Sequence, residues 1–361
     1  TAHITEGTKP GLGRVTCQYR NRCMRGCSYG AYFSSNSSTL PAAEATGNMT
    51  LMPNSIVHEI IYDEENKKAK GVRVIDAENN QSYEYYAKVI FLCSSTVPTT
   101  SILMQSKSNR FPNGMGNDSG ELGHNIMDHH FQVGASGTFD GFKNKTTYGR
   151  KPAGFFIPRF RNIGGSTNRK DFIRGYGYQG GANRGFMSIA DSKEELVSYG
   201  PRFKENIVKR DEWTASMNGF GEILPYHDNK MTLNYEKKDQ WGLPTVTFDA
   251  KIRENEMTMR KDMKIQAQEM LERSGFKNVS GYERKYVFGN GIHEMGTARM
   301  GNNPKTSVLN GNNQIHDVKN VYVTDGACMT SAGNQNPSIT YMALTARAVN
   351  HAVEELNKQN I

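Results

Sequence analysis

The sequence predicts a mixed α/β protein (α+β overall) that combines strand–helix units with an antiparallel sheet. Three observations indicate this class. The apolar runs 89–93 and 321–323 are short and rich in β-branched residues, as buried strands are. Segments 251–274 and 338–356 carry apolar residues at helical spacing. Between residues 154 and 234, glycine- and aromatic-rich runs alternate with turn residues, which is the pattern of an antiparallel sheet with long connections.

Length and charge limit the kinds of protein that this chain can be. Its 361 residues can bury a large core, and this length favours about two domains. No apolar run approaches the roughly 18 residues of a membrane-spanning helix, so we expect no transmembrane segment in this chain. The net charge is +8, from 44 Lys and Arg against 36 Asp and Glu, but no basic block is long enough for a nucleic-acid arm. We therefore expect a solvated surface and no nucleic-acid partner.

Three of the five cysteines, Cys17, Cys23 and Cys27, have the spacing C-x5-C-x3-C. An odd set clustered so tightly is a poor disulfide framework for a chain of this length. Thiolates held close together suit zinc or an iron–sulfur cluster. Structural zinc takes four ligands, and no fourth Cys or His lies nearby. We predict a three-iron cluster, with zinc and unligated thiols as alternatives. Cys93 and Cys328 are expected to be buried as small apolar side chains.

The first third of the chain is predicted to hold a series of short strands. They are expected at 48–52, 55–61, 70–75, 83–88 and 89–93, with a polar turn at 76–82. The last strand leads through Cys93 and Ser94 into an apolar helix that starts at Ser101. The expected unit is a strand, a turn and a helix.

The middle of the chain is predicted to form the antiparallel sheet and to end with a helix. Helix 251–274 has Ile252, Met259, Met263, Ala267, Met270 and Leu271 on one stripe and a glycine, Gly275, as its cap. Its methionines are expected to fill a core. No carboxylate pattern accompanies His124, His129 and His130, so we expect ordinary loop histidines there. The strand-like runs are 154–158, 175–181, 219–225 and 231–234, with a turn at 239–244.

Three linked pieces near the C-terminus are the strongest functional signal. His293 precedes a glycine-punctuated turn, His293-Glu294-Met295-Gly296-Thr297. The run Val321 to Val323 is followed by Thr324-Asp325-Gly326, and we expect this end of the strand to lie next to a ligand. The polar loop Asn334-Gln335-Asn336 stops at Pro337 and opens the last helix, whose free N–H groups suit an electron-rich ligand. A base, a strand tip and a helix N-terminus together predict a catalytic site.

This ordered set of motifs resembles the C-terminal signature of the glucose–methanol–choline (GMC) family of flavin oxidoreductases. The resemblance implies FAD as cofactor, His293 as catalytic base and Asn336 as the second catalytic residue. The flavin would be lined by Asp325, Gly326, Pro337 and Thr340, and the adenosine end by Val57, Cys93 and Ser94. The implied domains are a three-layer FAD domain from 1–110 and 285–361, and a substrate domain from 111–284.

The cysteine spacing is similar to that of a segment carrying a [3Fe–4S] cluster in some bacterial members of the family. Those members are sugar and polyol dehydrogenases, so the resemblance implies a sugar or polyol substrate, a small partner subunit and a cytochrome-type electron acceptor. Two alternatives stay open. One is an oxygen-using oxidase of the pyranose-oxidase kind, with structural or zinc-bound cysteines. The other is a non-catalytic binding or electron-transfer module. Either bacterial compartment, periplasm or cytoplasm, is compatible with the sequence.

One part of the family pattern is not recognised in the sequence. Flavin enzymes of this kind open with a strand, a G-x-G-x-x-G turn and a helix whose N-terminus holds the pyrophosphate. The chain instead begins at Thr1 on a polar segment. We therefore expect the C-terminal part of a longer enzyme.

From this expectation, the isolated 361-residue chain should bind FAD weakly or not at all. Without the phosphate-binding turn, the most negative part of the cofactor has no helix N-terminus to meet it. Flavin fluorescence quenching or calorimetry on the purified chain measures this affinity. Tight, stoichiometric binding of FAD would contradict the expectation.

Overall fold

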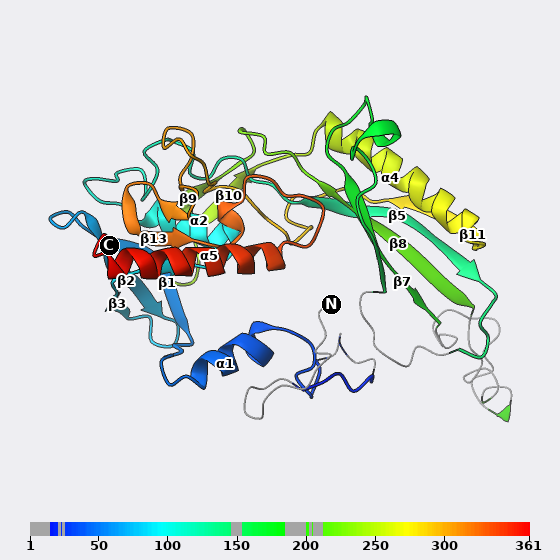
Figure 1. The fold of residues 1–361 in the computed structure, drawn as a ribbon, viewed down its shortest axis with the longest axis horizontal. Helices are drawn as coiled ribbons and strands as arrows, with labels where there is room; N and C mark the ends of the chain where they lie inside the picture. Colours follow the sequence, from blue (N-terminus) through cyan, green and yellow to red (C-terminus); the bar gives the residue numbers. More distant parts are fainter. Residues whose placement is uncertain are drawn as a thin grey trace.

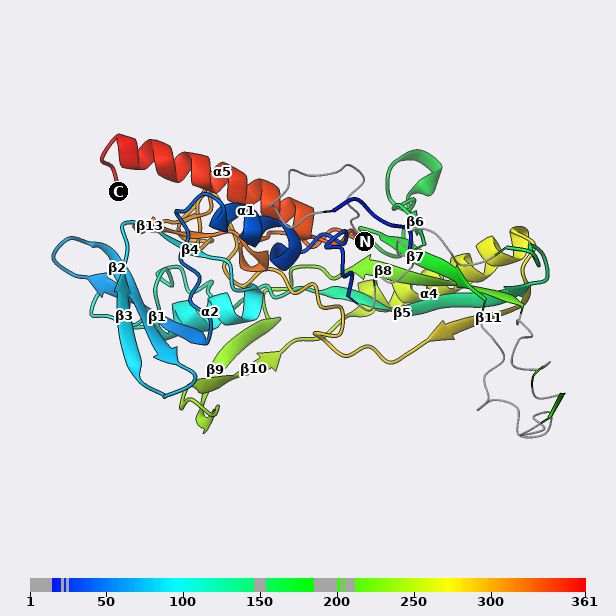
Figure 2. The same ribbon diagram turned by 90° about the horizontal axis from the view of Figure 1, so that it is seen from below.

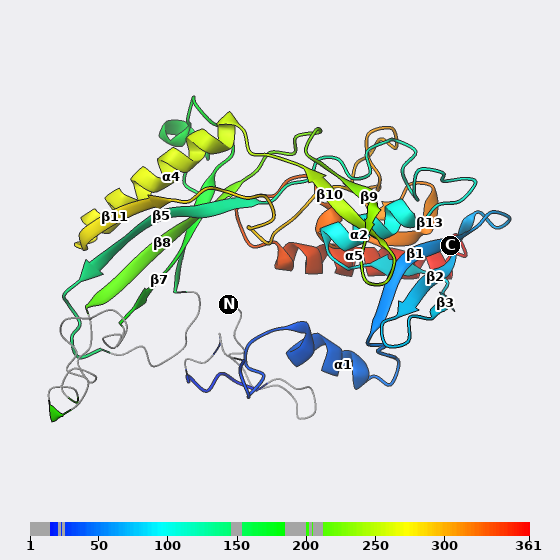
Figure 3. The ribbon, with the colours of Figure 1, turned by 180° about the vertical axis from the view of Figure 1, so that it is seen from behind.

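The computed structural model describes residues 15–20, 23, 26–145, 154–184, 200–201, 204 and 212–361 (Figure 1). Two lobes lie side by side, and both Figure 1 and Figure 2 show them separated along the longest axis. Helices α2 and α5 belong to one lobe and helix α4 to the other (Figure 3). No helix among the described residues is long and apolar enough to cross a membrane.

The first lobe is built on a small parallel core. Strand β4 (Ile90–Leu92) pairs in parallel with β13 (Val318–Val323), and β12 (Gln314–Ile315) pairs antiparallel with β13. Val321, Tyr322 and Val323 are fully buried, which confirms the predicted apolar strand. A parallel pair needs cover on its faces, and helix α2 (Thr96–Gln105) supplies part of it through Ile102 and Leu103.

A three-stranded antiparallel sheet packs beside this parallel pair. Its strands are β1 (Ser55–Asp63), β2 (Lys68–Asp76) and β3 (Ser82–Tyr86). The buried Asn320 side chain of β13 joins the two sheets: its amide donates to the carbonyls of Ala69 (2.7 Å) and Lys88 (3.0 Å) and accepts from the Ala69 N–H (3.0 Å). One side chain therefore satisfies three buried backbone groups.

Two local predictions in this lobe were wrong. Residues 48–52 form no strand, and Leu51 is 62% exposed, because no neighbouring strand offers this segment hydrogen bonds. Helix α2 begins at Thr96 rather than at Ser101. Pro98 can occupy the first turn of a helix, where its missing N–H has no partner in any case. Ahead of these strands lie η2 (Ser35–Thr39) and α1 (Leu40–Glu44).

The second lobe is a five-stranded antiparallel sheet covered by one helix. Its order is β11-β5-β8-β7-β6. Helix α4 (Glu254–Arg273) packs on it through Met259, Met263, Ala267 and Leu271, as the stripe predicted, and Gly275 follows with a φ of +85°. The strands are β5 (His129–Phe139), β6 (Phe155–Ile157), β7 (Tyr176–Asn183), β8 (Trp213–Glu222) and β11 (Lys277–Glu283).

The predicted run at 231–234 is not part of this sheet. Strands β9 (Lys230–Lys238) and β10 (Pro244–Asp249) form a hairpin of their own around the predicted turn. The hairpin lies beside α2 in the first lobe (Figure 3).

The expectation that the sequence holds no G-x-G-x-x-G was wrong, because these letters occur at 175–180. These residues run into strand β7, which pairs antiparallel with a strand on each side, whereas a dinucleotide-binding turn follows a parallel strand. A Cβ at Gly177 would lie 2.6 Å from the Asn334 Nδ2 and 2.8 Å from the Ile157 carbonyl oxygen. These glycines therefore allow close packing rather than phosphate binding.

Helix α5 (Ser338–Asn357) has the predicted bounds, but its apolar stripe faces outward in this chain. Ile339 is 78% exposed, Met342 49% and Val349 41%. The buried contacts come from Ala348 and Ala352, which pack on Tyr322 of β13. Small residues let the helix lie close to the parallel pair, and the larger apolar side chains are left on the opposite face.

The two lobes are connected through one buried carboxylate at the start of β5. Asp128 is fully buried and accepts five hydrogen bonds, all from neutral donors. Its Oδ1 accepts from the backbone N–H groups of His129 (2.7 Å) and His293 (3.1 Å). Its Oδ2 accepts from the Tyr286 hydroxyl (2.8 Å) and from the N–H groups of Gly289 (3.1 Å) and Gly291 (2.9 Å). Segment 286–293 is thereby wrapped around a single side chain.

Replacement of Asp128 by Asn should destabilise the protein by about 2–4 kcal/mol. In either orientation the new amide NH2 group faces two or three N–H or O–H donors, which then lose a buried acceptor. Urea unfolding followed by circular dichroism measures the loss. The control is Asp249→Asn at the exposed end of β10. Equal unfolding midpoints for the two variants would contradict this role of Asp128.

Candidate active site

His293 and Asn336, 43 residues apart in the chain, meet side by side. The His293 Nε2 lies 3.1 Å from the Asn336 Nδ2. On the other side of the ring, the His293 Nδ1 lies 2.9 Å from the Nδ1 of His129. The structure therefore brings together the two residues predicted as catalytic and adds a second histidine.

Hydrogen bonds continue on both sides of this group. The Gln179 side chain of β7 donates from Nε2 to the Asn336 Oδ1 at 2.6 Å. At the far end, the His129 Nε2 lies 3.1 Å from the Gly333 carbonyl oxygen. Strand β7 positions Gln179, strand β5 positions His129, and the loop before α5 positions Asn336. We call the four side chains of Gln179, Asn336, His293 and His129 the polar chain.

Sequence reasoning missed two members of the polar chain. His129 was expected to be a loop histidine, but it opens β5 and is fully buried. The adjacent pair Asp128-His129 was the available signal, because a carboxylate next to a histidine can fix a backbone. Gln179 gave no signal, because it lies among glycines and tyrosines of an ordinary strand.

Burial keeps both imidazoles of the polar chain neutral. Burial lowers the pKa of His293, and the nearby charge of Asp128 partly opposes this shift. Burial, followed by the proximity of His293, lowers the pKa of His129 to about 4. A neutral imidazole has one bare ring nitrogen that can take a proton. The site thus holds a base that is available at pH 7.

A second group of predicted residues gathers at the carboxyl ends of β4 and β13. Asp325 follows β13 and accepts from the Thr99 hydroxyl (2.5 Å) and the Ala327 N–H (2.9 Å). Burial raises the pKa of Asp325, and these hydrogen bonds oppose the rise. The Ser94 hydroxyl lies 2.8 Å from that of Thr99. Ligands bind parallel sheets at this edge.

Cys93 belongs to the same edge and corrects one expectation. It is exposed rather than buried, and its Sγ lies 3.3 Å from the Thr324 Oγ1. The strand ends at Leu92, so the next side chain reaches the open end of the sheet instead of its core. Cys328 is fully buried, as expected.

Gly326 connects this edge to the histidine. A Cβ there would lie 2.3 Å from the Thr96 Oγ1 and 2.4 Å from the Glu294 carbonyl oxygen, so only glycine fits. The Gly296 N–H donates to the Gly326 carbonyl at 3.0 Å, and the Thr96 hydroxyl donates to the Glu294 carbonyl at 2.5 Å. Glu294, the residue after His293, is therefore bonded to the start of α2, and Gly296 is bonded to the strand tip.

The other predicted cofactor residues occupy different positions. Pro337 is buried at the start of α5, and Thr340 is exposed in the first turn, with its N–H bonded to the Pro337 carbonyl. Val57 lies in β1, where the register with β2 shifts, and its side chain packs against the main core. It is not part of the group around Asp325.

Two of the three clustered cysteines, Cys17 and Cys27, lie outside helices and strands. Cys17 is buried, and Cys23 and Cys27 are half-buried. Gly26 has a φ of +77°, which glycine adopts without strain. Among the residues that the structure describes, however, no three His, Cys, Asp or Glu side chains converge as a metal-ligand set. The thiols are near in sequence but not gathered.

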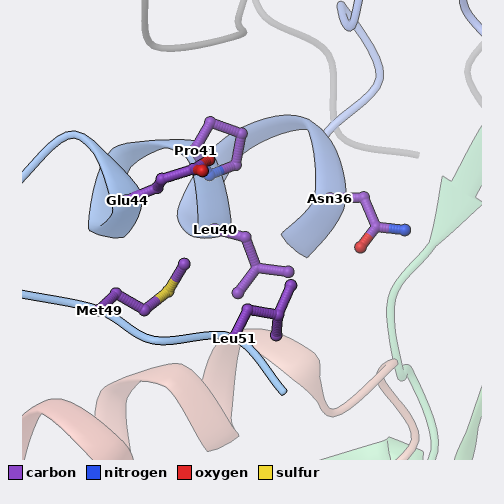
Figure 4. Close-up of a pocket in the computed structure, with 6 residues that line it drawn as sticks. All are labelled: Asn36, Leu40, Pro41, Glu44, Met49 and Leu51. Carbon is purple, nitrogen blue, oxygen red and sulfur yellow. The ribbon is translucent and has the colours of Figure 1, made fainter. Parts of the chain in front are cut away.

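A cavity of about 380 Å³ lies apart from the polar chain, between α1 and the segment that precedes β1 (Figure 4). It is open and contains none of the predicted site residues. Its lining residues are Asn36, Leu40, Pro41, Glu44, Met49 and Leu51.

Curated relatives match nearly the whole length of this chain. Among curated proteins, the 2-methyl-1,2-propanediol dehydrogenase of Mycolicibacterium austroafricanum is 29% identical over 94% of this chain and 61% of its own length. The fructose dehydrogenase large subunit of Gluconobacter japonicus is 25% identical over 97% of this chain and 62% of its own length. The chain thus spans about three fifths of the length of these relatives.

Solved structures share the architecture at low sequence identity. A structure of formate oxidase from Aspergillus oryzae, solved in a study of FAD modification, aligns with a TM-score of 0.60 at 16% identity. The alignment covers 89% of this chain and 64% of that one. In the sequence, residues 14–131 and 225–345 match the N-terminal and C-terminal parts of the GMC oxidoreductase family. The chain belongs to the GMC oxidoreductase family.

Proposed function

We propose that this protein is part of an FAD-dependent oxidoreductase that oxidises a CH–OH group of a sugar, glycoside or polyol. The observation that carries the proposal is the His293–Asn336 pair, fixed next to the Asp325–Gly326 strand tip. A base and a hydrogen-bond donor beside a ligand-binding sheet edge suit alcohol oxidation. Two relatives, a diol dehydrogenase and a fructose dehydrogenase subunit, support the substrate class.

The residues at the strand tip fit a flavin. Gly326 lets the Thr96 hydroxyl and the Glu294 carbonyl lie against the strand tip, where any side chain would collide with them. The Tyr341 hydroxyl is buried without a hydrogen-bond partner among the described residues, 3.0 Å from the position of a Cβ at Gly326. A bound flavin can supply such a partner, and its chemistry is to accept a hydride. Residues proposed to hold FAD are Val57, Cys93, Ser94, Asp325, Gly326, Pro337 and Thr340.

In the proposed reaction, His293 removes the hydroxyl proton of the alcohol while the carbon gives up its hydride. The bare Nε2 is the proton acceptor, and an imidazole suits this role because its pKa lies near the working pH. The Asn336 amide donates to the same oxygen and fixes its orientation. Gln179 holds the Asn336 oxygen, so the NH2 group of Asn336 is turned toward the His293 Nε2. The alcohol oxygen would enter between the two, accept from Asn336 and give its proton to Nε2.

The proposal assigns the flavin and the substrate to different parts of the chain. Residues 1–110 and 285–361 would form the flavin part, and residues 111–284 the substrate part. The polar chain lies where these parts meet, since His293 and Asn336 come from the first and His129 and Gln179 from the second. Alcohol and flavin would then be held from opposite sides.

The proposal also gives Cys17, Cys23 and Cys27 a role in electron transfer. Three thiols on one irregular segment have the donor chemistry of a [3Fe–4S] cluster, which would pass electrons onward to a small partner subunit and a cytochrome-type acceptor. One relative is the large subunit of a fructose dehydrogenase, which supports an assembly of several chains. The ungathered thiols favour the second candidate, an oxygen-using sugar oxidase in which Cys17, Cys23 and Cys27 are structural.

Replacement of His293 by Ala in the full-length enzyme should lower turnover by roughly two to four powers of ten, since a general base contributes about this much. Asn336→Ala should have a milder effect of the same kind. Steady-state kinetics, with bound flavin checked by its absorbance, measures both effects. The control is the exposed His227→Ala. Near-wild-type turnover of His293→Ala with flavin still bound would exclude this base.

Iron analysis decides between dehydrogenase and oxidase. Anaerobically prepared full-length protein should contain about three irons per chain if the cysteines ligate a three-iron cluster. Serine at Cys17, Cys23 or Cys27 should then abolish transfer to an external acceptor, while substrate still bleaches the flavin absorbance. Iron-free enzyme with full acceptor activity would instead support the oxidase.

A further inference from the structure

The two imidazoles of the polar chain face each other through the same kind of nitrogen. The His129 Nδ1 and the His293 Nδ1 are 2.9 Å apart, which is hydrogen-bond distance. When both rings are neutral, one of these nitrogens must carry a proton and the other must be bare. The hydrogen-bond partners at the outer ends of the polar chain determine which of the two Nδ1 atoms carries the proton.

At the His129 end, the partner is a backbone carbonyl. The Gly333 oxygen lies 3.1 Å from the His129 Nε2 and can only accept a hydrogen bond, so this Nε2 carries the proton of the neutral ring. The His129 Nδ1 is therefore bare. It follows that the His293 Nδ1 carries the proton and the His293 Nε2 is bare.

The opposite end leads to the same assignment. Gln179 donates to the Asn336 Oδ1, so the Asn336 Nδ2 is the atom that faces His293. An amide NH2 group can only donate, and it needs an acceptor at 3.1 Å. The bare Nε2 of His293 is that acceptor. The amide orientations at this end therefore agree with the proton direction that the Gly333 carbonyl sets at the other end.

This direction persists as long as His129 stays neutral. The ring is fully buried, and its burial lowers the pKa to about 4. The groups around it are His293, the Phe220 ring, the buried His130 and the Asp128 carboxylate, which accepts the His129 backbone N–H. Arg260 near His130 also opposes a positive charge in this region. No proton enters at His129 in the ordinary working range of pH.

We propose that His129 is a positioning residue that accepts a hydrogen bond from the His293 Nδ1 and thereby holds the His293 Nε2 bare toward the alcohol. The proposal rests on the proposed function in one respect, the use of His293 as a base. When Nε2 takes the hydroxyl proton, the Nδ1 proton stays in place and continues to donate to His129. The positive charge then lies on His293 alone.

A neutral acceptor has a different effect from a carboxylate. A carboxylate behind a histidine fixes its tautomer and also stabilises the imidazolium. Here Asp128 reaches His293 through the backbone N–H, and the ring is backed by neutral His129. The tautomer is fixed while burial keeps the pKa of His293 low. The base therefore stays unprotonated down to a lower pH than an ordinary histidine.

The test is nitrogen NMR on protein with 15N-labelled histidine, because 15N chemical shifts distinguish protonated from bare ring nitrogens. In the wild type, His293 should show a protonated Nδ1 and a bare Nε2, with a scalar coupling across the Nδ1–Nδ1 hydrogen bond. The opposite tautomer, or no coupling in a well-resolved spectrum, would overturn the proposal. This measurement needs neither activity nor a variant.

Two substitutions then separate positioning from packing. His129→Asn keeps an acceptor oxygen near the Nδ1 position, whereas His129→Leu fills the space without one. His129→Leu should lose the Nδ1-protonated tautomer of His293 and shift the acidic limb of kcat/KM to lower pH, because protonated His293 loses its acceptor. Its kcat in the full-length enzyme should fall about 10–100-fold, as second-sphere partners of histidine typically show, and His129→Asn should restore most of the loss.

The outcomes distinguish the two proposals. If His293→Ala retains turnover but the tautomer is as stated, the proposed function fails and the positioning role of His129 stands. If His129→Leu folds normally by circular dichroism and leaves the His293 tautomer and the pH profile unchanged, the positioning role fails. His227→Ala, a histidine exposed on the surface, should change neither readout.

Discussion

The structure depends on the buried carboxylate of Asp128. Five neutral donors surround it, four of them backbone N–H groups from β5 and the segment before His293. A buried charge without such donors would be very costly, so this carboxylate strongly favours one path of the chain around it. Gly291 is part of that path, since a Cβ there would lie 2.2 Å from the Asp128 Oδ1. Residues 165 positions apart are thereby fixed within hydrogen-bond distance.

The hydrogen bonds of Asp128 explain why the two histidines of the candidate site are fixed in place, and burial explains why their rings are uncharged. Asp128 aligns the backbones of His129 and His293, and their rings then meet through Nδ1 atoms. Because the carboxylate is occupied by backbone donors, it does not back the ring of His293 directly. The resulting base is held in one tautomer and kept unprotonated by burial, which suits the removal of a hydroxyl proton near neutral pH.

The same region shows how two lobes share one site. Strand tips of the parallel pair end at Asp325 and Cys93, where a ligand can approach the sheet edge. The antiparallel lobe contributes Gln179 from β7, whose neighbouring glycines permit close contact with the loop before α5. The outward apolar stripe of α5 shows that, among the residues the structure describes, one face of the parallel lobe is left uncovered.

The sequence alone determined the elements whose periodicity is strong and local: the buried strand 321–323, the methionine stripe of α4 and the last helix. It also indicated the His293–Asn336 pair, because three ordered motifs resemble one family. It could not indicate that His129 and Gln179 join that pair, since no local pattern connects residues on β5 and β7 to a loop more than 150 positions away. Residues 48–52 had strand-like composition, but a strand needs a neighbour to accept its hydrogen bonds. Proton positions, exposure and strand pairing depend on partners distant in sequence, so only the tertiary structure decided them.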